Sequence, residues 1–386
     1  MELQFTNLLR LLCALVFLAT TSAFPTWQRL LLTTSDSNRS ISISLFRSLE
    51  ELSRIVDISY CVGTTGIRRP FSCAGRCQDF PNFELVKSWN TGPLLADSCG
   101  YIALSHPPSK PRIILAFRGT YSVSNTVVDL STVPQEYIPY PGNEDVNGGK
   151  CNNCTVHLGF MTSWLNTRTQ ILPDIVKAIE DHPNYQLVLV GHSLGGAVAA
   201  LAALEFKARG WNPQVTTFGE PRVGNTALNR YIDAEFNMTD QEVKERSYRR
   251  VTHVEDPVPL LPLKEWNYRM HAGEIYISKR ELSPEVVDLQ HCAGDEDPLC
   301  IARADAQGVN LSHLWDRLTG EEEESQEIIQ GARWHHDEFW AVPSRYKLWE
   351  LFFAHRDYFW RLGLCVPGGD PHDWDRAYPS YDEDQE

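Results

Sequence analysis

The chain has 386 residues, of which 42% are hydrophobic and 22% are charged. This composition supports a buried core and excludes a disordered or collagen-like chain. Fifty acidic and 35 basic side chains give a net charge of −15. Such a charge repels phosphate backbones and anionic membranes at long range, so we expect no nucleic-acid partner.

The N-terminus is typical of a secretory signal peptide. Residues Leu11–Ala19 form a short apolar run, and small residues follow it before Phe24. The run is too short for a membrane-spanning helix, and Arg10 together with the small residues argues against a membrane anchor, which is the alternative. We therefore expect a signal peptide over residues 1–23, no transmembrane anchor, and a secreted, extracellular protein.

Six of the cysteines beyond the signal peptide fall in close pairs. The pairs are Cys73 with Cys77, Cys151 with Cys154, and Cys292 with Cys300. In a secreted chain these spacings indicate disulfides. A zinc site is the alternative, but no histidine lies at ligand spacing beside the pairs, so we expect no metal.

Short Asn-x-Ser/Thr sequons also fit an exported protein. They begin at Asn38, Asn153, Asn237 and Asn310. The sequons predict glycosylated surface loops at these positions.

Strand-like and helix-like segments alternate along much of the chain. The strand-like segments are short and rich in β-branched or aromatic residues: Phe83–Trp89, Cys99–Ser105, Arg112–Phe117, Gln186–Val190, Gln214–Phe218 and Tyr248–His253. The helical patterns cover Met161–Asp181, Leu194–Lys207 and Thr226–Phe236. The alternation from Arg112 onward predicts an α/β fold, in which helices flank a central, mostly parallel sheet.

The sequence Gly191-His192-Ser193-Leu194-Gly195 lies between an apolar strand and an alanine-rich helix. This context is typical of a nucleophile elbow, where side chains at the two glycines would collide across the turn. Backbone N–H groups at the start of the helix would face negative charge developing beside Ser193, and the N–H of Leu194 is the natural oxyanion donor. The alternative is that Ser193 only caps the helix.

A serine hydroxyl is too weakly acidic to attack an ester unaided, so a carboxylate and a histidine base should follow it in the chain. Asp256 comes just after the strand that ends near His253, and the adjacent Glu255 is a rival. Several later histidines are candidates for the base: His271, His291, His313, His335, His336, His355 and His372. His355 lies among aromatic residues that would exclude water, although a packed core histidine is an equal interpretation.

A series of short motifs follows in a fixed order along the chain. The motifs are ISYC at Cys61, AFRGT at Thr120, HLGF at Phe160, GHSLGGA at Ser193, FGEPRVGN at Asn225, THVEDPVPLLP at Asp256, HAGEIYI at His271 and AHRDYFWRLGLC at Cys365. This series, over roughly Leu49–Cys365, resembles the filamentous-fungal class 3 lipase family of the α/β-hydrolase superfamily, which is related to feruloyl esterases.

The resemblance implies a role for each polar residue of the site. It assigns Ser193 as nucleophile, Asp256 as orienting acid and His355 as base. It also implies Thr120 as a second oxyanion donor beside Leu194. In the same pattern, Asp129 would hold the Thr120 hydroxyl.

The cysteines match the family as well. The resemblance implies the three close pairs as disulfides and adds a fourth between Cys61 and Cys365. Cys99 is left over, and we expect a buried thiol there, with intermolecular pairing as the alternative.

The segment after the oxyanion residue departs from the family, whose lid helix commonly carries a tryptophan. Thr126 stands in the place of that tryptophan. Val123, Val127 and Leu130 still fall on one helical face, and Asp129 lies beside them. We expect a small apolar lid that opens at an oil surface.

The resemblance implies one α/β-hydrolase domain over residues 24–365, stapled by disulfides. Residues 303–344 match nothing in the family pattern and predict an insertion. Residues 366–386 are acidic and extend beyond the usual end of the family, so we expect a solvated, flexible tail.

Together these features predict a secreted lipase that hydrolyses carboxylic esters of acylglycerols through a Ser-His-Asp acyl-enzyme mechanism. Its partner would be an ester or lipid substrate at an oil–water interface, it would need no cofactor, and we expect a monomer. A feruloyl or short-chain carboxylesterase is the first alternative. A catalytically silent, lipid-binding protein with a hydrolase fold is the second.

Overall fold

The computed structural model describes residues 39–92, 97–120, 134–140, 151–238, 246–303 and 353–367. The predicted signal peptide, the lid residues, nearly all of the insertion and the tail beyond residue 367 lie outside these ranges. The chain divides into two units, Met1–Ser40 and Ile41–Glu386, and every element described below belongs to the second unit.

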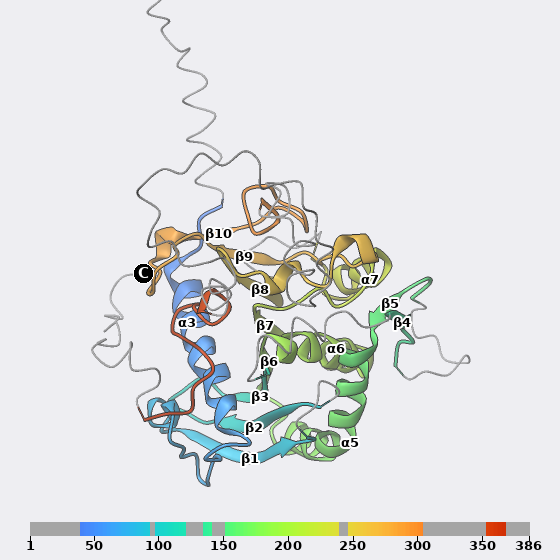
Figure 1. Cartoon of the computed structure of the whole chain (residues 1–386). Helices are drawn as coiled ribbons and strands as arrows, with labels where there is room; N and C mark the ends of the chain where they lie inside the picture. The colour runs from blue at the N-terminus through green and yellow to red at the C-terminus, as the bar shows by residue number, and fades with distance from the viewer. Residues whose placement is uncertain are drawn as a thin grey trace, which may run out of the picture. The chain divides into compact units, whose positions relative to one another are not determined.

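The described strands form one eight-stranded sheet in the order β1-β2-β3-β6-β7-β8-β9-β10 and a second, two-stranded sheet of β4 and β5. Their bounds are β1 Phe83–Asn90, β2 Cys99–Ser105, β3 Arg112–Arg118, β4 Pro134–Glu136, β5 Thr155–His157, β6 Gln186–His192, β7 Gln214–Phe218, β8 Tyr248–His253, β9 Glu274–Ile277 and β10 Leu289–His291. Strands β3, β6, β7, β8 and β9 run parallel, and the outer pairings are antiparallel. This arrangement confirms the predicted fold class (Figure 1).

The predicted strands all begin at the residues where the structure begins them, and three of them run one or two residues further. Strands β4, β5, β9 and β10 were not predicted. Each has at most four residues, and β9 opens on an acidic residue, Glu274. Such short segments show no alternation long enough to indicate a strand.

Helices cover both faces of the sheet. The α-helices are α3 Ile43–Ile58, α5 Leu158–Asp181, α6 Leu194–Ala208 and α7 Thr226–Glu235. Short 3-10 helices lie at η1 Ser59–Cys61, η2 Arg76–Asp79, η4 Val258–Leu260, η5 Lys264–Trp266 and η6 Val286–Asp288. Helix α3 was not predicted, although the side chain of Ser42 caps it by accepting a hydrogen bond from the Leu45 amide.

The central strands separate two hydrophobic cores. Ile113, Leu115 and Phe117 of β3 pack into the core that holds α5 and α6, whereas Ile114 and Ala116 pack into the core that holds α3. This alternation is the two-residue period of a strand that is buried on both faces. In Figure 1, α3 lies on one side of the sheet and α5 and α6 lie on the other.

The described part of the chain contains four disulfides, which are the pairs implied by the family resemblance: Cys61–Cys365, Cys73–Cys77, Cys151–Cys154 and Cys292–Cys300. The first ties the C-terminal segment around His355 to η1. Cys99 is a buried free thiol that donates a hydrogen bond to the Asn90 side chain. No helix among the described residues has the length and apolar character needed to cross a membrane.

Candidate active site

Ser193 lies at the sharp turn between β6 and α6, with φ 58° and ψ −130°. Few side chains adopt a positive φ, so the surrounding structure must hold the turn in place. A Cβ atom at Gly191 would lie 2.3 Å from the Gly195 carbonyl oxygen, and one at Gly195 would lie 2.3 Å from that of Phe117. Only glycine fits at either position. At Gly191 the collision is across the turn, as predicted, whereas at Gly195 it is with β3.

Ser193 does not act as an ordinary helix cap. Its side chain makes no capping hydrogen bond to α6. Its amide donates to the Phe218 carbonyl oxygen at 2.9 Å, which ties the turn to the end of β7. The hydroxyl is therefore not used to hold the helix, and the capping interpretation of Ser193 is wrong.

The predicted oxyanion donors come to the same edge of the sheet as Ser193. Strands β3 and β6 are parallel, and Phe117 pairs with Gly191. Two residues further along, a Cβ atom on Gly119 would lie 2.8 Å from that of Ser193, so Thr120 follows directly beside the turn. Leu194 is the first residue of α6, so its N–H has no acceptor within that helix.

Asp256 follows β8 and is buried. Its Oδ1 accepts from the Val258 amide at 2.9 Å, and its Oδ2 accepts from the Tyr358 hydroxyl at 2.5 Å. The neighbouring Glu255 is exposed and forms an ion pair of 2.7 Å with Arg280. The structure thus aims Asp256, and not Glu255, into the site.

His355 is fully buried, and its Nδ1 lies 2.9 and 3.0 Å from the two carboxylate oxygens of Asp256. Because a carboxylate accepts, Nδ1 carries the proton, which leaves the lone pair on Nε2. Among the described residues Nε2 has no hydrogen-bond partner, so the bond to the Ser193 hydroxyl is not formed here. In an enzyme without substrate such bonds are often long and tighten only in the complex.

The ring of His192 links the two halves of the site. His192 directly precedes Ser193, and its ring stacks on that of His355 with centroids 4.7 Å apart. The His355 ring therefore lies next to the elbow. Of the other candidate histidines, His271 pairs with Glu220. His291 pairs with Ile275, which pairs with Val251 on β8, before the end of that strand and the Asp256 loop.

Sequence reasoning missed two residues that shape the site. A Cβ atom on Gly219, whose φ is +60°, would lie 2.6 Å from the Tyr358 hydroxyl and 2.8 Å from Cε1 of His355. Tyr358 itself bonds to Asp256. Both stand inside motifs already noted, but a tyrosine among aromatic residues indicates core packing, and nothing in the sequence distinguishes this one.

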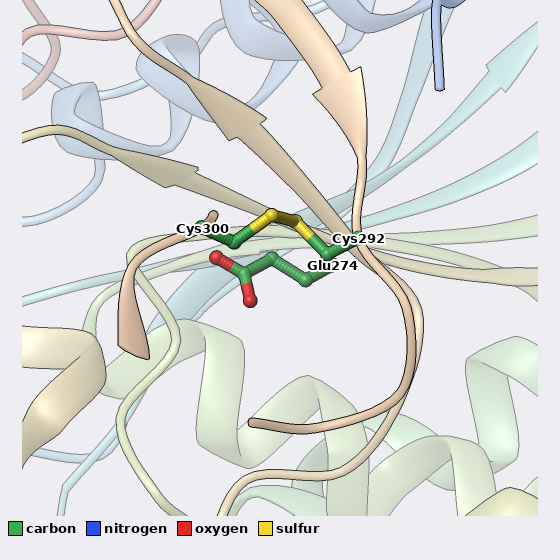
Figure 2. Close-up of side chains that lie close together, drawn as sticks. All are labelled: Glu274, Cys292 and Cys300. Carbon is green, nitrogen blue, oxygen red and sulfur yellow. A yellow bond between two sulfur atoms is a disulfide. The ribbon is translucent and has the colours of Figure 1, made fainter. Parts of the chain in front are cut away.

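Among the described residues, one group has the composition of a metal site: Glu274, Cys292 and Cys300 (Figure 2). The two sulfur atoms are joined in a disulfide, so neither offers a thiolate. One carboxylate oxygen of Glu274 already accepts from Thr252 and from the Ile301 amide. Burial raises the pKa of Glu274, which further disfavours its charged form. The group does not fit a metal ion.

The remaining predicted residues divide between exposed positions and positions without a described structure. The sequon residues Asn153 and Asn237 are exposed. The predicted residues outside the described ranges are Asn38, Asn310, Val123, Thr126, Val127, Asp129 and Leu130, with the histidine candidates His313, His335, His336 and His372.

The sequence matches one family of known proteins. Residues 114–266 fit the family model described as lipase (class 3). Secreted mono- and diacylglycerol lipase 2 of Gibberella zeae is 53% identical over 372 residues, which cover 88% of this chain and 87% of that protein. Secreted mono- and diacylglycerol lipase A of Penicillium cyclopium is 35% identical over 60% of this chain and 70% of that protein.

Solved structures give the same result. The crystal structure of the Lip2 lipase of Yarrowia lipolytica aligns with a TM-score of 0.67 and 29% identity, over 85% of this chain and 97% of that chain. The long, high-identity match to the Gibberella zeae protein extends the likeness well beyond the elbow motif. The chain belongs to the class 3 lipase family.

Proposed function

We propose that Ser193, His355 and Asp256 are the nucleophile, the general base and the orienting carboxylate of this lipase. The observation that supports these roles best is the buried His355–Asp256 hydrogen bond beside a strained serine turn. Asp256 holds the proton on Nδ1, so Nε2 is left with the lone pair that a general base needs. The other contacts of Asp256, from Val258 and Tyr358, fix the carboxylate in place.

The protein is a secreted lipase that hydrolyses carboxylic esters of acylglycerols. In the proposed mechanism Nε2 of His355 takes the hydroxyl proton of Ser193, and Oγ attacks the ester carbonyl carbon. The N–H groups of Thr120 and Leu194 stabilise the tetrahedral oxyanion. The alcohol leaves with the proton from His355, which then activates a water molecule to release the acid.

The substrate class is proposed more finely from the relatives. Two of them are named mono- and diacylglycerol lipases, so we propose that this enzyme prefers partial glycerides to triacylglycerols. Long-chain acylglycerols are poorly soluble, which supports action at an oil–water interface.

Every group in the mechanism comes from one chain, so a monomer suffices. The exposed side chains of Asn153 and Asn237 support glycosylation there.

Covalent labelling tests the proposed nucleophile. A fluorophosphonate ester should form an adduct on Ser193 of the folded protein, located by peptide mass spectrometry. Ser193→Ala should abolish the adduct, whereas Ser163→Ala, which removes a buried hydroxyl on α5, should leave it. Absence of any adduct on folded wild-type protein would favour the catalytically silent alternative.

A hydrolysis profile tests the proposed substrate. We expect faster hydrolysis of mono- and diolein emulsions than of triolein, and slower hydrolysis of feruloyl esters and soluble short-chain esters. The opposite order, with the short-chain or feruloyl esters fastest, would replace the lipase preference by that of an esterase.

A further inference from the structure

Both ring nitrogens and one ring face of His192 are engaged, although the mechanism above gives this residue no role. Its Nε2 lies 2.8 Å from the main-chain carbonyl oxygen of His355, and its Nδ1 lies 2.5 Å from the Tyr60 hydroxyl. Its ring lies nearly parallel to the His355 ring, with an interplanar angle of 29°. The edge of Tyr358 faces the same ring. All of these groups are buried.

These contacts define one protonation state. A carbonyl oxygen only accepts, so Nε2 of His192 carries a hydrogen atom. Burial and the neighbouring charge of His355, with a smaller effect from Arg356, hold the pKa of His192 well below its ordinary value, although the bond to the His355 carbonyl opposes this. The ring is therefore neutral, and Nδ1 accepts a hydrogen bond.

Tyr60 supplies the donor that completes this arrangement. Burial raises the pKa of Tyr60, so the phenol keeps its proton and donates a hydrogen bond to Nδ1 of His192. Tyr60 comes from η1, next to the cysteine that is bonded to Cys365. The hydroxyl thus selects the tautomer in which Nε2, and not Nδ1, is protonated.

We propose that His192 is a positioning residue for ester hydrolysis. In its neutral form, with the tautomer selected by Tyr60, His192 holds the backbone and the ring plane of His355. This inference rests on the proposed role of His355 as base. Asp256 fixes one edge of the His355 ring, and His192 fixes its face and its main chain. Together they restrict the direction of Nε2. A neutral partner also avoids repulsion when His355 becomes an imidazolium.

Three variants test the proposal. His192→Phe keeps an aromatic ring but removes the hydrogen bond to the His355 carbonyl, and misplacement of a catalytic group should lower kcat by about 10- to 100-fold. KM should change little because the His192 ring is buried. His192→Gln carries an amide N–H near the original Nε2 and should restore part of the lost kcat. Tyr60→Phe should lower kcat by a smaller factor.

The double variant separates positioning from packing. If Tyr60 acts through His192, adding Tyr60→Phe to His192→Phe should lower kcat no further. Wild-type kcat in His192→Phe, no rescue by His192→Gln, or independent multiplication of the two effects would overturn the proposal.

Two further measurements do not depend on the stability of the variants. In wild-type protein with ¹⁵N-labelled histidine, the His192 ring should show a protonated Nε2 and an unprotonated Nδ1 across the active pH range. The acid limb of kcat/KM should have the slope of a single proton. A doubly protonated His192 ring or a two-proton slope would contradict the proposal. Wild-type protein that fails to label at Ser193 would instead overturn the proposed function.

Discussion

Two buried histidine–carboxylate pairs in the described part of the chain have nearly the same geometry. His355 lies 2.9 Å from Asp256, and His271 lies 3.0 Å from Glu220. All four side chains are at most 2% exposed. The pairs differ at the second ring nitrogen. In His271 it donates to the Ala272 carbonyl oxygen, whereas in His355 it has no partner among the described residues.

That difference separates a structural pair from a reactive one. The Glu220 carboxylate also accepts from Thr217 and Tyr248, so its pair with His271 is closed within the fold. A histidine with both nitrogens bonded to oxygen acceptors has no lone pair available to take a proton. A buried histidine–carboxylate pair is therefore not evidence of catalysis by itself. The unused nitrogen beside a nucleophile is what the proposed mechanism requires.

The largest effect is expected from the reactive pair. Asp256→Asn should lower kcat by about 10⁴-fold, because an amide in that place favours the wrong tautomer of His355. The matched control is Glu255→Gln, which changes the adjacent, exposed carboxylate and should leave kcat nearly unchanged. Steady-state kinetics on a diacylglycerol emulsion would measure both. Similar losses in the two variants would contradict the assignment of Asp256.

Breaking the closed pair should instead affect stability. Glu220→Gln leaves His271 without its buried counter-charge, and such a loss typically lowers the free energy of unfolding by about 3–5 kcal/mol. Activity per folded molecule, counted by phosphonate titration, should change far less than in Asp256→Asn. Urea unfolding measures the first effect. Unchanged stability together with a loss of kcat as large as that of Asp256→Asn would contradict the distinction between a structural pair and a reactive pair.

A smaller effect should appear in the pH dependence of stability. Burial alone would raise the pKa of Glu220, but the charge and hydrogen bond of His271, with Arg250 and Thr217, outweigh it and lower the pKa. A lowered pKa contributes stability that is present above the unfolded value of about 4.3 and is lost as pH falls through the lower folded value.

The stability advantage of wild-type protein over Glu220→Gln should therefore shrink below about pH 4. Urea unfolding midpoints of both proteins, measured at intervals of about one pH unit from about pH 3 to about pH 7, would show this. An advantage that grows on acidification would mean that the pair has the opposite linkage.

The sequence predicted the elements whose signals are local. The strand ending at His192 and the alanine-rich helix after Ser193 have strong patterns. Gly191 is required by a contact within the turn, whereas Gly195 is required by the carbonyl oxygen of Phe117 on β3, which the local sequence does not indicate. Asp256 could not be separated from Glu255, because the two follow the same strand. The positive φ of 67° at Glu255, which turns that side chain outward to Arg280, is a feature of the folded loop.

The contacts around His355 could not be predicted from the sequence, because they join residues that are far apart along the chain. Tyr60, His192 and Tyr358 come from three distant segments, and their hydrogen bonds depend on how η1, β6 and the C-terminal segment pack. In sequence, nothing next to any of the three indicates its partner. The family resemblance singled out His355 and its partner Asp256, but it did not indicate the contacts of His192 and Tyr358 with this pair.

The central claim is that Nε2 of His355 takes the hydroxyl proton of Ser193. A crystal structure of the Ser193 phosphonate adduct, which mimics the tetrahedral intermediate, tests this most directly. We predict that Nε2 lies within hydrogen-bond distance of an oxygen atom on the adduct, with Nδ1 still bonded to Asp256. An adduct in which the His355 ring is out of reach, or in which another histidine takes its place, would contradict the account.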